Sequence, residues 1–312
     1  MATATGSGLR VGYVAESTIG TTPATPEFKV LETTGFNVNL TKELIEATLL
    51  GGRDRKCLRH GNRTVGGDIP SLLIYGHQDD LLEAALGGTW EADTPAVGTD
   101  QLTNGSVRRG FTIFRQDPAL GADSYRYYTG CEMNTLNLEL TPNSDVVFTV
   151  GVIGVDSPNE HAEKAGATYI EPSGDCPFSY DSGSILDDGV ELADVTQLTM
   201  TVENNIESSF VLFSKTTGSK PQGKINVSGN VTAQFQNFTL YDKFISGEKS
   251  SLEVNLLDEA GNAYKITLPR TMFNTGNTDV GGEGEITISL DFTAELDSAT
   301  GSTIIVERTP VV

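Results

Sequence analysis

The segment GNRTVGGDI at residues 61–69 has a partner, GKINVSGNV, at residues 223–231, which lies 162 positions later (223 − 61 = 162). Both share the pattern Gly-x-x-x-Val-x-Gly followed two positions later by Ile or Val. Side chains of a β-strand point alternately to opposite faces, so each segment is predicted to be a strand with one buried face. The recurrence predicts two copies of one structural unit. The alternative is generic β patterning, because Gly-x-Val alternation is common in β proteins.

A short helical pattern follows the first strand. In QDDLLEAALGG, residues 78–88, two aspartates lie near the positive N-terminal end of the predicted helix and Gly87 ends it. The same offset, extended without a gap, pairs Leu73 with Phe235, Asp80 with Asp242, Leu82 with Phe244, and Ala85 with Gly247. Each half is therefore predicted to contain one short helix after a strand.

Alternation of apolar residues predicts further strands in both halves. In the first half they cover residues 28–40, 65–75, 110–115, 125–129, 133–141 and 146–155. The second half ends in EITISLDFTAEL, where Ile286, Ile288, Leu290 and Phe292 alternate. The predicted fold is mainly β, with two related β-sandwich or barrel-like modules, each with one short flanking helix.

Composition predicts the boundaries of these modules. Residues 1–27 are rich in Gly, Thr, Ala and Pro and are predicted to form an N-terminal arm. Residues 157–188 are rich in Ser, Gly, Pro and acidic residues and are predicted to be a linker. The first module then spans residues 28–156, and the second spans residues 189–312 with a C-terminal strand or arm.

The charge balance and the scarcity of reactive groups exclude several function classes. The 312 residues carry a formal net charge of −21, which disfavours ordinary nucleic-acid binding. Three widely spaced cysteines and three histidines in no ligand pattern predict neither a disulfide framework nor a metal site. No residue set predicts a catalytic or cofactor site, so we expect no enzyme. The N-terminus lacks a signal-peptide pattern, which predicts folding in a cytoplasm, and no apolar run predicts a membrane span.

Several stretches resemble phage tail tube proteins. The similarity lies in GYVAESTIGTTPATPEFKVL at residues 12–31, YGHQDDLLEAALGGTW at residues 75–90, and two long segments at residues 229–273 and 285–308. The resemblance covers most of the chain and lies in the residue pattern and the order of the predicted strands and helices, not in a motif of chemically reactive residues.

This resemblance implies a structural virion protein of the phage tail, assembled in the host bacterial cytoplasm. Subunits of that kind close into rings that stack into a tube, with tape measure and terminator proteins as further partners and DNA passing through without specific binding. Two modules per chain favour a trimeric ring with pseudo-six-fold symmetry, and a hexameric ring is the alternative. Open sheet edges would then be paired by neighbouring copies.

Residues 41–63 are predicted to be an exposed loop and occupy the place of the loop through which tail tube proteins touch the next ring. The candidate contact residues are Arg53, Asp54, Arg55, Lys56 and Arg59, and the second-half counterpart is residues 206–224. We expect the basic side chains to meet acidic surface on the adjoining ring. The alternative is a solvated charged loop.

A second function class is a β-sandwich virion binding module of the adhesin or carbohydrate-binding type. One tryptophan and few clustered aromatic residues weaken that interpretation.

Overall fold

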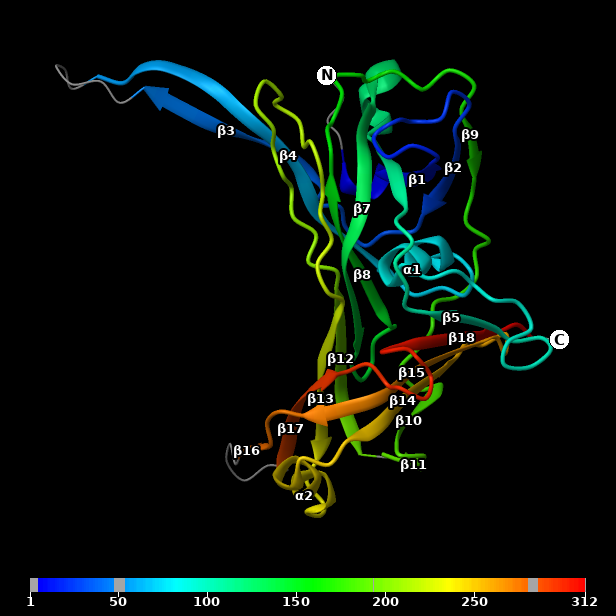
Figure 1. Ribbon diagram of the computed structural model, residues 1–312. Helices are drawn as coiled ribbons and strands as arrows, with labels where there is room; N and C mark the ends of the chain where they lie inside the picture. The colour runs from blue at the N-terminus through cyan, green and yellow to red at the C-terminus, as the bar shows by residue number, and fades with distance from the viewer. Residues whose placement is uncertain (1–4, 48–53, 193, 280–285, 312) are drawn as a thin grey trace.

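The computed structural model describes residues 5–47, 54–192, 194–279 and 286–311. Strands dominate this part of the chain, and two short helices lie beside them (Figure 1). The predicted mainly β fold is confirmed. No helix in the described ranges is long and apolar enough to span a membrane.

Among the described residues of the first half, seven strands pair in the order β2-β1-β6-β7-β8-β4-β3, all antiparallel. Helix α1 follows β4 directly, and its C-terminal residue is followed by Gly87 in the left-handed conformation. The bounds are β1 (Arg10–Glu16), β2 (Glu27–Leu31), β3 (Asn39–Ala47), β4 (Lys56–Leu72), α1 (Asp79–Leu86), β6 (Gly110–Gln116), β7 (Tyr125–Leu140) and β8 (Val147–Gly154).

The second half repeats this order as β11-β10-β14-β15-β17-β13-β12. Helix α2 follows β13 as α1 follows β4, and β16 continues the line of β15 along β17. The repeat predicted from two sequence segments is therefore a repeat of the whole strand order. The bounds are β10 (Gly183–Asp187), β11 (Val190–Glu191), β12 (Val195–Glu203), β13 (Asn226–Gln234), α2 (Thr239–Ser246), β14 (Ser250–Leu257), β15 (Ala263–Phe273), β16 (Asn277–Asp279) and β17 (Thr287–Ala294).

Three short strands lie outside the repeated set. Strand β9 (Thr168–Ile170) adds to β2, and β18 (Ile305–Thr309) pairs with both β15 and β5 (Asp100–Thr103). The end of the second half is thereby attached to the first half. One cluster of buried apolar side chains extends through both halves, so they share a core.

The repeated glycines have a common steric reason. A Cβ atom at Gly67 would lie 2.2 Å from the carbonyl oxygen of Asn37, and one at Gly229 would lie 2.1 Å from that of Thr199. Asn37 and Thr199 are themselves 162 positions apart (199 − 37 = 162). In each half, the segment before the repeated strand, at Asn37 just before β3 and at Thr199 within β12, approaches so closely that only glycine fits.

Four boundary predictions are wrong. The predicted arm contains β1, whose Val11 and Tyr13 side chains are buried, and the predicted linker contains β9 and β10. Short strands with few apolar residues were hidden by their Gly- and Thr-rich surroundings. The predicted strand at residues 28–40 is divided into β2 and β3, whereas the two predicted at 125–129 and 133–141 are one strand, β7.

The spacing of 162 residues, predicted to continue without a gap, does not hold for the helices. Both helices have eight residues and end at a left-handed glycine, Gly87 or Gly247, which are 160 positions apart (247 − 87 = 160). The connection from strand to helix is therefore two residues shorter in the second half.

We predict that Gly67→Ala and Gly229→Ala each lower the free energy of unfolding of the unassembled protein by about 1–3 kcal/mol, because the neighbouring strand must move away. Gly6→Ala is the control, because a Cβ there meets nothing within 4 Å. Urea titration followed by circular dichroism measures the change. Equal stability of all three variants would contradict the steric explanation.

Candidate functional site: a polar sheet face and a projecting hairpin

Six strands form one continuous sheet across both halves, in the order β4-β8-β7-β12-β13-β17. The junction is the antiparallel pairing of β12 with the second part of β7, from Leu198 opposite Leu140 to Glu203 opposite Thr135. Alternate residues such as Val150, Leu138 and Met200 are buried on one face. The other face is consequently made of the residues between them.

This second face is polar and acidic. Besides Thr, Ser and Asn residues it bears four carboxylates, from Asp68, Glu139, Glu203 and Asp291, all exposed or half-buried. The strand segments that build it, residues 65–72, 135–140, 147–154, 195–203, 226–234 and 287–294, contain no lysine or arginine. We call this surface the polar sheet face.

Side-chain contacts confirm that these residues share one face. Thr201 donates a 3.0 Å hydrogen bond to the Asn137 side chain, which links the two halves, and Asn230 donates one of 2.7 Å to Asp291. Over Gly151 the nearest atoms to an added Cβ would be Thr135 Oγ1 at 2.1 Å and Asp68 Oδ1 at 2.9 Å. The polar face therefore runs without interruption from β4 to β17.

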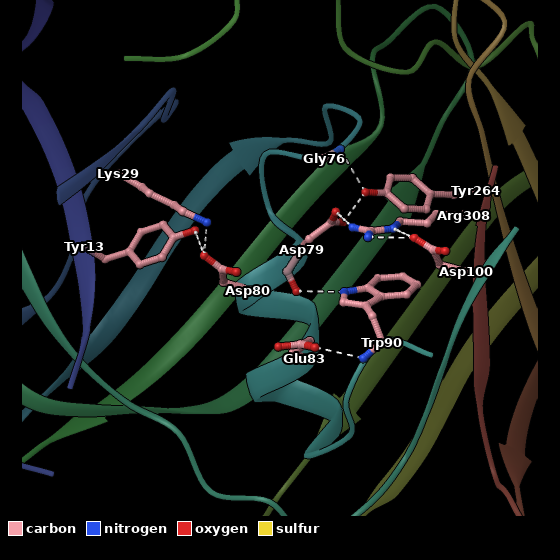
Figure 2. Close-up of polar contacts among 10 residues, drawn as sticks. All are labelled: Tyr13, Lys29, Gly76, Asp79, Asp80, Glu83, Trp90, Asp100, Tyr264 and Arg308. Atoms are coloured by element: carbon pink, nitrogen blue, oxygen red, sulfur yellow. Dashed lines mark hydrogen bonds and ion pairs between the residues drawn. The ribbon is translucent and has the colours of Figure 1, made fainter. Parts of the chain in front are cut away.

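Helix α1 holds the two halves together behind this sheet. Its buried Asp79 accepts hydrogen bonds from Tyr264 on β15 and Arg308 on β18, as Figure 2 shows. Arg308 also donates to Asp100 at 2.8 Å, and its guanidinium lies 4.6 Å from the centre of the Trp90 ring. We call this set the junction cluster.

In the junction cluster, burial and charge pairing shift the pKa of Asp79 in opposite directions. Burial raises the pKa of Asp79, and the hydrogen bond from Tyr264 and the charge of Arg308 oppose that shift. The neighbouring Asp80 points to the first half, where it pairs with Lys29 and accepts a 3.3 Å hydrogen bond from Tyr13 (Figure 2). Two adjacent carboxylates at one helix start thus bind opposite sides of the molecule.

The predicted loop at residues 41–63 is wrong as a loop. Strand β3 and the first part of β4 pair from Asn39 opposite Gly66 to Ala47 opposite Lys56 and form a hairpin that projects from the body (Figure 1). Most of its side chains are exposed on both faces. With neither face buried, the sequence needs no apolar alternation, and this is why the pattern did not predict strands.

The structure describes four of the five predicted contact residues, and all four lie on this hairpin. Arg53 lies outside the described residues, and Lys56 belongs to β4. Asp54, Arg55 and Arg59 are exposed, and Arg55 Nε lies 3.6 Å from the Glu46 carboxylate. Three exposed apolar side chains in the described part of the hairpin, Leu44, Ile45 and Leu58, were missed because nothing in the sequence marks them as surface residues.

The counterpart segment, residues 206–224, lies between β12 and β13 and packs beside the hairpin. The Arg63 backbone N–H donates a 2.8 Å hydrogen bond to the carbonyl of Lys215. The buried Lys220 ammonium lies 2.6 Å from the Glu132 carboxylate, which also pairs with Arg108. The two segments therefore leave the body at neighbouring places.

A family model described as phage tail tube protein matches residues 6–294. The chain belongs to the phage tail tube protein family. A search of curated proteins found no match. This tail tube protein is thus a structural component of a virion tail that assembles with copies of itself and with other tail proteins. In the described ranges no three His, Cys, Asp or Glu side chains gather as metal ligands.

We predict that Arg308→Met in this tail tube protein lowers the free energy of unfolding by about 2 kcal/mol at neutral pH, because a largely buried carboxylate loses its cation. Loss of Arg308 also removes a cause that lowers the pKa of Asp79, so that pKa rises further. A raised folded-state pKa favours folding at low pH and disfavours it above, so the deficit shrinks as pH falls through the pKa of Asp79.

Urea titration of the unassembled protein at neutral and mildly acidic pH measures this. The control is Lys265→Met, which removes a partly exposed ion pair with Glu253 (N–O distance 3.4 Å) and should cost about 0.5 kcal/mol or less at both pH values. A deficit for Arg308→Met that is independent of pH would contradict the assigned role of Asp79.

Proposed function

We propose that this protein closes into rings that stack into the tail tube, with the polar sheet face lining the channel for DNA. The observation that supports this most strongly is the division of one continuous sheet into a buried apolar face and an exposed polar face without lysine or arginine. Such a surface needs water or a polar solute beside it. A channel wall satisfies that requirement over both halves at once.

Each half is proposed to be one module of the ring. Because the two halves share one strand order, three chains supply six equivalent modules, and a trimeric ring with pseudo-six-fold symmetry follows. A hexameric ring, with six chains, is the alternative. The modules in this proposal begin at β1 and β10, not at the boundaries expected from composition.

The carboxylates of Asp68, Glu139, Glu203 and Asp291 are proposed to face the lumen. They would repel DNA phosphates, and the absence of basic side chains from the same strand segments removes the contacts that hold DNA. The genome could then slide through the channel without specific binding.

The hairpin and residues 206–224 are proposed to contact the adjoining ring. Arg55 and Arg59 supply positive charge to an otherwise acidic subunit, and Leu44 and Leu58 supply apolar area. The alternative is that the charged hairpin is simply solvated. Tape measure and terminator proteins are the further partners proposed for the assembled tube, and the host bacterial cytoplasm is the proposed place of assembly.

Negative-stain electron microscopy of the purified protein tests the proposal. Rings or hollow filaments of uniform width are expected. Monodisperse monomers that bind glycans would instead favour the alternative, a β-sandwich virion binding module.

We predict that Asp68→Lys makes assembled tubes retain short duplex DNA, with retention that falls as salt is raised, because every subunit then presents a cation to the channel. Co-sedimentation of fluorescent DNA with tubes measures retention. Glu259→Lys carries the same charge change on an exposed residue away from the polar sheet face and should retain no more DNA than the unsubstituted protein. Equal retention by both variants would place Asp68 outside the lumen.

We predict that the combined variant Arg55→Glu with Arg59→Glu folds normally but forms shorter or fewer tubes, because reversed charges then face an acidic neighbour. Circular dichroism checks folding, and micrographs give the distribution of tube lengths. Lys164→Glu with Lys265→Glu is the control of equal charge change, because Lys164 lies before β9 and Lys265 in β15, away from the hairpin. Normal tubes from the hairpin variant would remove the inter-ring role of these arginines.

A further inference from the structure

The contact between the two halves has a defined hydrogen-bond pattern. At the end of β12, the Asn204 backbone N–H donates to the carbonyl of Asn134 at 2.8 Å, and its side chain donates to the carbonyl of Ala85 near the end of α1 at 2.7 Å. Two residues later, the Ile206 N–H donates to the Asn134 side chain at 2.7 Å. Thus β12 of the second half closes on β7 and α1 of the first half.

Each partner in this contact has a counterpart in the other half. In the second half, Val202 of β12 lies opposite Val227 of β13, and in the first half Leu40 of β3 lies opposite Val65 of β4. Strand β3, with the residues just before it, is therefore the counterpart of β12, and equivalent residues are 162 positions apart (202 − 40 = 162). The second part of β7 corresponds to the end of β15 and to β16. Asn137 lies opposite Thr149 and Asn277 opposite Ser289, which gives an offset of 140 (277 − 137 = 140).

Both counterpart edges are open. Within the described ranges, β3 pairs only with β4, and β16 pairs only with β17. The Asn37 N–H donates to the carbonyl of Asp68 in β4, so the alternate residues Val38, Leu40 and Lys42 direct their backbone groups away from β4. An unpaired row of this kind is a template for another strand.

We propose that these two edges pair with each other between chains, β3 of one copy lying antiparallel to β16 of the next. This inference rests on the proposed ring and specifies its interface. Transferring the register of β12–β7 by the two offsets places Asn39 opposite Asn277, Leu40 opposite Gly276 and Thr41 opposite Thr275 of the neighbouring copy. The occupant of each edge is therefore a second copy of this chain.

A retained asparagine supports this pairing independently. Asn274 is the counterpart of Asn134 (274 − 134 = 140), whose side-chain oxygen binds the other half. Asn274 is exposed, its Nδ2 donates to Thr293 at 2.7 Å, and its Oδ1 accepts no hydrogen bond in the described part of the chain. In the proposed contact this oxygen accepts from the backbone N–H of Leu44 in the neighbouring copy.

The two helices differ as the proposal requires. Helix α1, which the other half covers, has six buried residues, whereas α2 has none. The side chains of Phe238, just before α2, and of Ile245 within it are 61% and 64% exposed. The counterpart of Asn204, which binds the end of α1, is Lys42 (204 − 42 = 162). Its ammonium group on the neighbouring copy would lie near the C-terminal end of α2, where a positive charge is favourable.

Engineered disulfides test the register. In a background with the exposed Cys57 and Cys176 changed to serine, Asn39→Cys with Asn277→Cys places two thiols at a pair without mutual backbone hydrogen bonds, where Cα atoms lie about 4.5 Å apart. Oxidised tubes should give covalent oligomers on non-reducing gels, with the ladder ending at the trimer. Thr41→Cys with Thr275→Cys, two positions along, is a second variant with the same expected result.

Two controls bracket this result. Asn137→Cys with Thr201→Cys is the equivalent pair inside one chain and should form a disulfide within the monomer. Asn39→Cys with Glu259→Cys should give no ladder. Tubes in which neither test pair crosslinks would overturn the proposed pairing while leaving the ring intact, whereas failure of the unsubstituted chain to form rings or tubes would overturn the proposed function. A ladder ending at the hexamer would support the pairing and reject the trimeric ring.

Discussion

The backbone pairing of β12 with the second part of β7 is the interaction on which the rest of the structure depends. It joins two halves of equal strand order into one sheet, and the register it sets places Leu, Met and Val side chains of both halves on one face. A shift of one residue would turn every one of these side chains to the opposite face. The shared core and the polar sheet face are therefore consequences of a single register.

Steric and electrostatic details maintain that register. Gly67 and Gly229 allow the backbone at Asn37, just before β3, and at Thr199 in β12 to approach the repeated strands equally closely. The junction cluster then fixes β15 and β18 against α1 through Asp79 and Arg308, at the cost of a carboxylate held in a buried position. Because Asp79 also accepts a hydrogen bond from Tyr264 and Arg308 also donates to Asp100, these contacts compensate the free energy lost when the two charges are removed from water.

The repeat shows the same module in two environments. In the first half, α1 is covered by the second half, and in the second half α2 is left with exposed apolar side chains. An arrangement with one satisfied and one open contact of the same kind is typical of a heterologous interface, in which copies add head to tail until a ring closes. The monomer thus contains an internal example of the contact that assembly would repeat.

Sequence alone determined the elements whose residues carry a local signal. Alternation identified long buried strands such as β8 and β17 but was not recognised in β12, whose Leu198, Met200 and Val202 are buried. The two repeated glycines indicated a duplication, and Asp79 with Gly87 marked the ends of α1. It did not find β1, β10 or the hairpin, because short or doubly exposed strands are stabilised by backbone pairing with distant partners and need no apolar pattern. The sequence also did not identify four acidic residues that share the polar sheet face: Asp68, Glu139, Glu203 and Asp291. Whether acidic residues of different strands share a face depends on the register between those strands. That register is set by contacts between residues far apart in the chain, and only the tertiary structure decides it.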